Sequence, residues 1–349
     1  MRAITCTGYG APTEVLRLDD IAVPSLADDE VLVAVHAASL NPADWHLVRG
    51  LPYLARLQVG LRRPPFEVPG SDVAGRVEAV GPAVTTVRPG DEVYGTTFMA
   101  GFGALAERVA VPERLVAHRP QRATVEQSAG LPLAATTALQ ALRDHGGLEA
   151  GQRVLVIGAA GGVGSHAVQL AKAFGAEVTG VCSTSNVEHV RALGADHVVD
   201  RRTEDLIAAA GRHDLVVQLA GTQSARELRT LVEPDGTLLS LSGDSPNRWI
   251  GPLGRVVTGL VLGRAGGPTV RAFTVQPDRA DLELLARLVD DGRLTTSVER
   301  RCDLADAPRA LEELERGHAR GKVVVTLGPE PGAPEDTAAT GTDHEARVF

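Results

Sequence analysis

A strand, a glycine-rich turn and a helix follow one another directly at residues 153–174, and this feature constrains the fold most. An apolar run predicts a buried strand, and the helix is expected at Ser165–Phe174. Gly161 and Gly162 let the backbone approach a pyrophosphate, whereas Gly164 lets the helix lie close on the strand. The N–H groups at the helix start suit an anion. The turn therefore predicts a dinucleotide-phosphate site formed by Ala160, Gly161, Gly162, Val163 and Gly164.

The surrounding pattern supports this interpretation over a glycine-rich connection that binds nothing. Ala159 stands where the G-x-G-x-x-G fingerprint has its first glycine, so the turn alone is ambiguous. Strands alternate with helices from about Thr124 onward, as expected of a doubly wound parallel sheet. Beside the strand of the turn, we expect strands at residues 177–182, 197–199, 214–218, 237–240 and 269–275.

The two ends of the chain have a different pattern of predicted strands and helices. The first 120 residues contain short strands broken by turn residues, which predicts an antiparallel, barrel-like region. We expect those strands at residues 30–36, 72–80, 92–95 and 106–111. After residue 277 we expect helices at 279–288 and 307–317 and strands at 295–300 and 322–327. The last segment, 328–349, has almost nothing apolar to bury and is predicted to be a disordered tail.

Charge and cysteine content exclude several function classes. The formal net charge of −9 argues against nucleic acid or an anionic membrane as a general partner, although a local basic patch remains allowed. The three cysteines are far apart, so they form neither a disulfide framework nor a Cys-x-x-Cys metal site. No run approaches the ~20 apolar residues of a membrane span, and the start does not look like a signal peptide. We therefore expect a cytoplasmic protein.

The end of the second strand indicates which nicotinamide cofactor is bound. Ser183, Thr184 and Asn186 lie there, and no acid follows until Glu188, whereas an NAD site usually places an acid on the ribose 2′-hydroxyl. NADPH is therefore the expected cofactor. Arg201 and Arg202, just after the third strand, are candidates for binding the 2′-phosphate, and a solvated surface role for both is the alternative.

Several segments together resemble the medium-chain dehydrogenase/reductase superfamily, in its zinc-lacking, quinone oxidoreductase-like branch. The resemblance implies a GroES-like catalytic domain from residues 1–123 and 277–327, a Rossmann NADP(H)-binding domain over 124–276, and an active site in the cleft between them. The segments that carry it are the glycine turn, Ser39–Asp44, Pro69–Gly75, Gly90–Val93, Pro132–Leu142, Gly194–Asp196 and Gly317–Val324.

The zinc ligands of metal-dependent members are replaced in this chain. The residues that look like the counterparts of those ligands are Asn41, the pair Ser71 and Asp72, and Leu133. One carboxylate cannot hold zinc alone, and the cysteine-rich lobe of a structural zinc is absent from the sequence. We therefore expect no metal site.

Without a metal, conjugated substrates are the easier ones to reduce. Hydride addition to a quinone or enone spreads charge into a hydroquinone or enolate, whereas an isolated ketone needs a stabilised alkoxide. By resemblance, Asn41 and Thr137 lie near the nicotinamide and its ribose, and Lys322 lies near the cofactor. Asn41 before Pro42 also fits a plain helix N-cap.

Three residues are candidates for a proton donor. Tyr53 follows Gly50 one residue later than the tyrosine of the enoyl reductases that this chain resembles. Its phenol can donate a proton, but a packing role is the alternative. Asp44 and His46 are candidates for a proton relay in place of Tyr53. The alternatives are that Asp44 only orients the backbone and that His46 is a plain surface residue.

Two segments have unassigned roles. Residues 52–65 mix apolar and cationic side chains and resemble an extension over the substrate cleft, with a solvated cationic face as the alternative. Residues 249–263 are largely apolar and fit a pocket wall or a subunit contact.

We therefore expect an NADPH-dependent reductase of quinones or α,β-unsaturated carbonyl compounds. The alternatives are a zinc-independent alcohol or ketone dehydrogenase and a cofactor-binding member with vestigial or non-redox activity. The partner is then a small quinone, enone or ketone. The strand expected at 269–275 lies at a sheet edge and predicts a homodimer.

Overall fold

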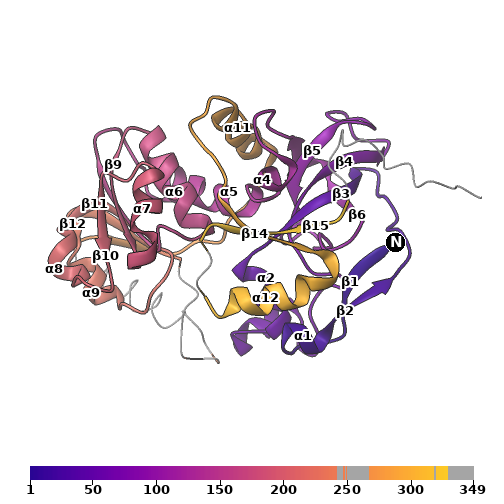
Figure 1. The fold of residues 1–349 in the computed structure, drawn as a ribbon, viewed down its shortest axis with the longest axis horizontal. Coiled ribbons are helices and arrows are strands. Elements are labelled where there is room, and N and C mark those ends of the chain that lie inside the picture. The colour runs from indigo at the N-terminus through magenta and orange to yellow at the C-terminus, as the bar shows by residue number, and fades with distance from the viewer. Residues whose placement is uncertain (242–246, 248, 250–266, 318–319, 329–349) are drawn as a thin grey trace, which may run out of the picture.

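The computed structural model describes residues 1–241, 247, 249, 267–317 and 320–328 (Figure 1). The tail predicted beyond residue 328 and most of the apolar segment 249–263 lie outside these residues. Within the described ranges, no helix has the length and apolar character that crossing a bilayer requires.

One sheet has six parallel strands in the order β10-β9-β8-β11-β12-β13. Val154 and Val156 of β8 pack into a core shared with α6, whereas Leu155 and Ile157 pack into a core shared with α8 and α9. Both faces are therefore covered, and this explains the continuous apolar strand. The elements are β8 (Arg153–Ile157), β9 (Glu177–Cys182), β10 (His197–Asp200), β11 (His213–Gln218), β12 (Val232–Ser240), β13 (Thr269–Arg271), α5 (Pro132–Gln140), α6 (Gly162–Ala173), α7 (Val187–Ala192), α8 (Leu206–Ala210) and α9 (Ala225–Arg229).

The second sheet has seven strands and is built from both ends of the chain. Its order is β14-β15-β3-β4-β5-β7, and β6 also pairs with β3. Val323 of β15 lies antiparallel to Leu40 of β3, so the C-terminal segment completes a sheet that the N-terminal part begins. The elements are β3 (Glu30–Leu40), β4 (Asp72–Val80), β5 (Glu92–Thr96), β6 (Arg108–Pro112), β7 (Val116–His118), β14 (Val298–Asp303) and β15 (Lys322–Thr326).

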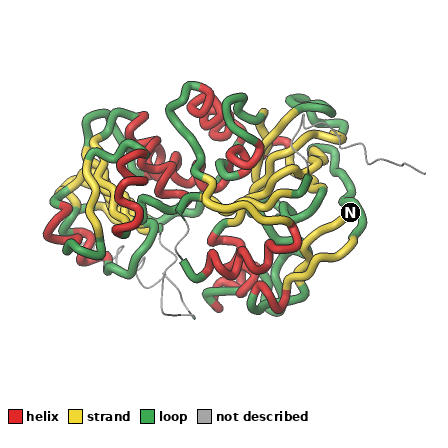
Figure 2. The backbone as a smooth tube through the Cα atoms, viewed as in Figure 1, coloured by secondary structure: helices red, strands yellow, loops and turns green. Residues whose placement is uncertain are grey.

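Shorter elements surround this second sheet, and Figure 2 shows the strands gathered in two groups with helices between them. A separate two-stranded ribbon joins β1 to β2. The remaining elements are β1 (Arg2–Cys6), β2 (Leu16–Asp20), α1 (Pro12–Val15), α2 (Pro42–Arg49), α3 (Arg56–Val59), α4 (Val125–Ala129), α11 (Arg279–Asp290) and α12 (Ala307–Glu315). The predicted class is confirmed: an α/β protein with a β-rich domain and a doubly wound parallel sheet.

Most strand positions agree with the sequence analysis, and the differences have local causes. Helix α6 begins at Gly162 instead of Ser165, because Gly161 already takes the cap position. The strand expected at 295–300 lies at Val298–Asp303, because both backbone groups of Thr295 bond to the Gln169 side chain.

Two further strands differ in length. β3 continues past the expected end to Leu40, where β15 pairs with its last residues. β13 ends at Arg271, four residues earlier than expected, and that arginine side chain donates to the carbonyl of His145.

Candidate active site

The glycine turn places an uncapped helix start at the carboxyl end of β8. Gly161 is the N-cap of α6 in an extended conformation and offers no side chain to the first-turn amides. The N–H groups of Gly162, Val163 and Gly164 have no acceptor within the helix, and the helix dipole favours an anion there. These residues and Ala160 are the ones that the sequence predicts to hold a cofactor phosphate.

The glycines of the turn have different tasks. A Cβ at Gly164 would lie 2.1 Å from the carbonyl oxygen of Gly158, so α6 packs directly on the backbone of the turn. At Gly161 the nearest atom to such a Cβ is 3.5 Å away, which leaves its surface open. Gly158 has a φ of +93° and makes the tight bend that Ala159 cannot make. The missing first glycine of the fingerprint is thus replaced by the preceding one.

The C-terminal segment runs along this turn. The N–H of Gly321 donates to the carbonyl of Ala160 at 2.9 Å, and Gly321 forms a bridge with Gly161. A Cβ at Gly321 would lie 2.2 Å from the carbonyl oxygen of Ser297, so this close passage requires glycine. The bridge holds Arg320 and Lys322 on either side of the phosphate turn.

Arg320 reaches the loop after β9, which the sequence analysis did not anticipate. Its Nε donates to Asn186 Oδ1 at 3.1 Å, and its Nη2 donates to the carbonyl of Ser185 at 3.4 Å. The signal for it was present, because Arg320 lies within the motif Gly317–Val324. It brings a guanidinium to the loop where a 2′-phosphate is expected.

The loop after β9 is otherwise ordered by short polar contacts. Asn186 Nδ2 donates to Ser183 Oγ at 3.2 Å. Asp200, at the end of the neighbouring β10, accepts from the Arg202 N–H, and a hydrogen bond from Thr184 is the main cause that lowers its pKa. Arg201 is exposed, and its N–H donates to the carbonyl of Cys182 at 3.0 Å, so its backbone lies beside the loop.

The positions that resemble former metal ligands lie together around Asp72. This carboxylate is buried and accepts from Asn41 Nδ2 at 2.9 Å and Ser39 Oγ at 3.1 Å. Its other oxygen accepts from the N–H of Leu133 at 3.0 Å, in the first turn of α5, where the helix dipole also favours a negative charge. Asp72 therefore has both of its oxygens occupied by donors of the chain itself.

Lys322 supplies the positive charge at the same place. Its side chain is 3% exposed, and Nζ lies 2.6 Å from Asn41 Oδ1 and 3.7 Å from Asp72 Oδ2. Burial raises the pKa of Asp72 and lowers that of Lys322, and the attraction between the two opposes both shifts. The lysine stem passes over the phosphate turn, because a Cβ at Gly162 would lie 3.0 Å from Lys322 Cδ. Lys322 thus links the turn to the polar cluster.

This cluster does not fit a zinc ion. An amide, a carboxylate with both oxygens bonded and a leucine offer no tetrahedral set of nitrogen and sulfur ligands, and the ammonium of Lys322 lies among them. Throughout the described ranges, no group of three or more His, Cys, Asp or Glu side chains is placed to hold a metal.

Asp44 lies in the same buried network and accepts hydrogen bonds from its neighbours. Its two oxygens accept from the Asn41 N–H at 2.7 Å and from Ser71 Oγ at 2.8 Å, so it holds the start of α2 in place. Burial raises the pKa of the Asp44 carboxyl to about 7, against those hydrogen bonds. These two hydrogen bonds suit a residue that positions its neighbours, and the relay with His46 stays a prediction.

The other predicted residues make contacts of their own. Thr137 is the one residue of α5 that is not buried, and its hydroxyl donates to the carbonyl of Leu133 at 2.7 Å. His46 is half-buried and stacks on Trp45 with ring centroids 3.6 Å apart. Tyr53 is half-buried, with the Arg56 guanidinium 4.8 Å from its ring centroid.

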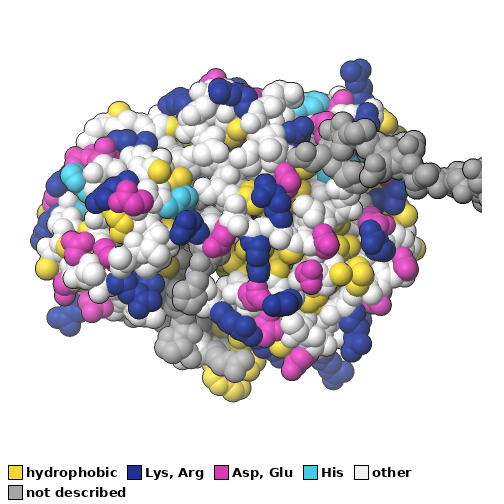
Figure 3. Space-filling model, in the orientation of Figure 1, with side chains coloured by type: hydrophobic (Ala, Val, Ile, Leu, Met, Phe, Trp, Pro, Cys, Tyr) yellow, Lys and Arg dark blue, Asp and Glu magenta, His cyan; other side chains and the backbone are white. Residues whose placement is uncertain are grey.

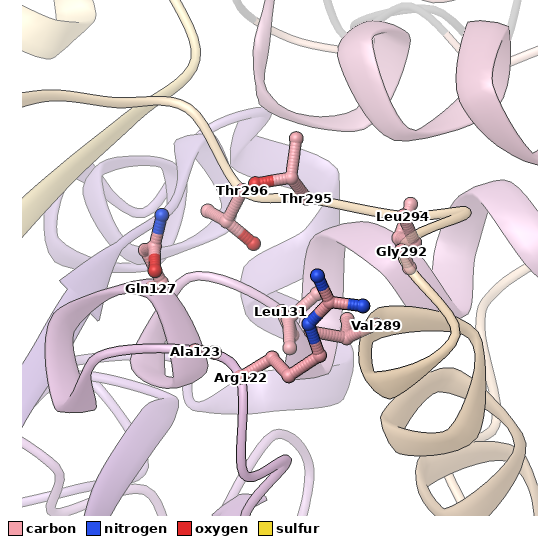
Figure 4. A pocket seen from close by; sticks show the side chains of 9 residues that line it. All are labelled: Arg122, Ala123, Gln127, Leu131, Val289, Gly292, Leu294, Thr295 and Thr296. Atoms are coloured by element: carbon pink, nitrogen blue, oxygen red, sulfur yellow. The ribbon is translucent and has the colours of Figure 1, made fainter.

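A cavity of about 170 Å³ lies beside α4 and α11, and Figure 4 shows Arg122, Gln127 and Thr296 around it. None of the predicted site residues lines it.

Thr296 Oγ1 lies 3.2 Å from Nε2 of His166, a buried residue of α6. Burial, followed by the charge of Lys322, lowers the pKa of His166 to about 3, so its ring is neutral at pH 7. Sequence reasoning did not single out His166, because it resembles any core histidine on an apolar helix face.

Comparison with known families covers both domains. Residues 27–121 match the alcohol dehydrogenase GroES-like domain, and residues 193–325 match the family described as zinc-binding dehydrogenase. The second description names a metal that the residues around Asp72 do not fit.

Individual relatives match along nearly the whole chain. The chloroplastic quinone-oxidoreductase QR1 of Triphysaria versicolor is 32% identical, over 93% of this chain and 98% of that protein. The mitochondrial NAD(P)H oxidoreductase RTN4IP1 of Mus musculus is 34% identical, over 91% of this chain and 87% of that protein. The solved quinone oxidoreductase of Coxiella burnetii superimposes with a TM-score of 0.82 at 31% identity, over 94% of this chain and 99% of that one.

Proposed function

Because this chain belongs to the medium-chain dehydrogenase/reductase superfamily, in its quinone oxidoreductase-like branch, we propose that it is an NADPH-dependent reductase of quinones or α,β-unsaturated carbonyl compounds that works without a metal. The wider family membership supports an NAD(P)H-dependent oxidoreductase with a small-molecule substrate. The choice of NADPH, the substrate class and the independence from metal are our proposal.

One observation carries the proposal: an open dinucleotide turn lies next to a former metal position that the chain has filled. The amides at the start of α6 are available for a pyrophosphate. Asp72, by contrast, accepts hydrogen bonds from the chain on both of its oxygens and is balanced by Lys322. The site therefore combines cofactor binding with a fixed internal cation.

Different residues suit different parts of a bound dinucleotide. The turn from Ala160 to Gly164 suits the pyrophosphate, while Ser183, Asn186, Arg201 and Arg320 suit the adenosine 2′-phosphate. A carboxylate in the 2′ position would repel that phosphate, and Asp200, the acid at the end of β10, accepts a hydrogen bond from the backbone N–H of Arg202. These features support NADPH over NADH.

The nicotinamide end has the polar groups that hydride transfer needs. By family resemblance, Asn41 and Thr137 lie near the ring and its ribose, and both are held in fixed hydrogen bonds. A bound nicotinamide supplies the hydride. The buried Lys322 ammonium favours negative charge that develops in its neighbourhood, and a conjugated acceptor spreads that charge over several atoms. Tyr53 remains the proposed proton donor.

The proposal is tested by following NADPH absorbance with a panel of 1,4-quinones, enones, ketones and alcohols. We expect turnover with quinones or enones, higher kcat/KM with NADPH than with NADH, and no change after treatment with a chelator. Reduction of simple ketones alone would point to an alcohol or ketone dehydrogenase. NADPH binding without any turnover would show that the redox activity is vestigial.

The exchange Tyr53→Phe tests the proton donor in the same assay. A fall in kcat at unchanged NADPH affinity is expected, and unchanged turnover would remove Tyr53 from the mechanism.

The proposed homodimer through the edge strand β13 is tested by sedimentation equilibrium, where a monomer would contradict it.

A further inference from the structure

An apolar surface lies at the segment that follows α2, next to Tyr53, whose ring meets the Trp249 ring edge-on with centroids 5.3 Å apart. Leu57 is 70% exposed, Leu61 is 67% exposed and Trp249 is 72% exposed. Leu54, which is 44% exposed, belongs to the same segment as Leu57 and Leu61, and its N–H donates to the carbonyl of Trp249 at 3.0 Å, so Trp249 lies against that segment. Figure 3 shows hydrophobic side chains gathered at the lower edge of the molecule, beside the grey atoms. We call Leu54, Leu57, Leu61 and Trp249 the apolar patch.

The segment is fixed from its inner side, so the exposure does not come from a loose chain. The Arg56 guanidinium lies 4.1 Å from the ring centroid of Tyr9 and 4.8 Å from that of Tyr53. Its nitrogens donate to the carbonyls of Gly50 and Arg49. The Tyr9 hydroxyl donates to the carbonyl of Gly60 at 2.5 Å. These contacts hold the backbone on both sides of Leu57 while its side chain points to solvent.

Positive charge lies directly beside the apolar patch. Residues 49–66 contain four arginines and no acid, in a chain whose formal net charge is −9. Arg49 pairs with Glu315 and Arg56 is engaged by the two tyrosines. Arg62 and Arg63 are both exposed, and in the described part of the chain neither forms an ion pair. Apolar and cationic side chains therefore project together from one short segment.

We propose that the apolar patch, with Arg62 and Arg63, docks this protein on the surface of an anionic lipid bilayer. Leucine and tryptophan side chains enter the boundary between head groups and acyl chains, and arginines bind lipid phosphates. The negative charge of the rest of the protein repels the same bilayer, so only this face binds. The docking is peripheral. The proposed docking does not rest on the proposed function, and its test measures binding without any turnover.

Vesicle sedimentation of the full chain tests the proposal. More protein is expected to sediment with vesicles that contain phosphatidylglycerol than with pure phosphatidylcholine, and added salt is expected to reduce the difference. The double exchange Leu57→Glu with Leu61→Glu is expected to lower the bound fraction about fivefold or more, because it places charges in the insertion surface. The double exchange Arg62→Gln with Arg63→Gln is expected to remove the preference for anionic lipid.

The control is Met99→Glu, since Met99 is 64% exposed and lies outside the apolar patch. It should bind vesicles as the parent protein does. Thermal unfolding followed by circular dichroism confirms that each variant is folded. Equal binding to both lipids, or full binding by the leucine variant, would overturn the proposal. A change in the sedimentation of the leucine variant without vesicles would also overturn it, because a second copy of the chain would then cover the patch.

Discussion

The glycine turn and the cluster around Asp72 lie next to each other, yet the helix amides at the turn lack a side-chain cap, whereas the polar groups of the cluster have partners in the chain. At the turn, Gly161 leaves the first amides of α6 without a cap, and its surface is open. At the cluster, Asn41 and Lys322 complete the partners of Asp72, and all three side chains are buried. Unpaired donors mark a place that a ligand fills, whereas saturated groups mark a place that the chain itself has filled.

Under the proposed metal-free mechanism, the contrast explains how a chain that matches the family described as zinc-binding dehydrogenase works without zinc. A zinc ion needs a tetrahedral set of nitrogen, sulfur or carboxylate ligands, and the cluster of Asn41, Asp72 and Leu133 does not offer one. A dinucleotide needs backbone amides and room, and the turn provides both. Substitutions that change one region and spare the other therefore test the account, and they follow in order of expected effect.

The largest effect is expected from Gly164→Val. Its Cβ would lie 2.1 Å from the carbonyl oxygen of Gly158, where backbone cannot yield, so we expect a loss of ~3 kcal/mol or more in the free energy of unfolding. The matched change Gly161→Ala meets nothing closer than 3.5 Å. It should keep the unfolding free energy and weaken NADPH binding. Urea unfolding and a fluorescence titration with NADPH measure the two effects, and equal stabilities of both variants would contradict the packing argument.

The exchange Lys322→Met should cost nearly as much. It leaves the Asp72 carboxylate buried without its cation, which typically lowers the free energy of unfolding by ~3–5 kcal/mol. The loss should shrink at lower pH, because a protonated Asp72 carries no charge. The double variant with Asp72→Asn should recover part of the stability. A single variant as stable as the parent in guanidinium unfolding would show that the pair is not coupled.

Arg320→Gln is expected to act on the cofactor alone. Without the guanidinium that contacts Asn186, affinity for NADPH should fall by roughly tenfold, while affinity for NADH should stay the same. Arg316→Gln is the control, since Arg316 lies at the end of α12 and pairs with Glu312. Isothermal calorimetry with both cofactors measures this. Equal losses for NADPH and NADH would place Arg320 outside the 2′-phosphate site.

The smallest effect concerns pH. Because the pKa of Asp44 is raised to about 7, its contribution to stability is present below its ordinary pKa and is lost as the pH rises through about 7. The side-chain amide of the Asp44→Asn variant cannot ionise. The parent should therefore lose about 1 kcal/mol of unfolding free energy relative to this variant between about pH 6 and about pH 8. A pH-independent difference in urea unfolding would contradict the raised pKa.

The sequence predicted the fold well, because strand and turn signals are local. The apolar run of β8 and the glycines after it define the parallel sheet and its phosphate turn without reference to the rest of the chain. The ends of strands were less predictable. β13 is shorter than its apolar pattern suggests, and β14 is displaced by the pairing of Thr295 with Gln169.

The site was predictable only in part, because it depends on contacts between distant residues. Lys322 meets Asn41 since β15 pairs with β3, and nothing in either segment indicates which side chains will touch. Arg320 escaped notice for the same reason, as its partner Asn186 lies in the other domain. Family resemblance placed Lys322 near the cofactor, and the structure adds that its charge is shared with Asp72.

The central claim is that the turn is open to NADPH while the cluster around Asp72 is closed to zinc. Calorimetric titration of chelator-treated protein with NADPH and, separately, with zinc tests both halves, with quinone reduction assayed on the same sample. The account predicts saturable NADPH binding, no stoichiometric zinc binding and the same turnover with or without zinc. Stoichiometric zinc binding that raises turnover, and that Asp72→Asn abolishes, would contradict it.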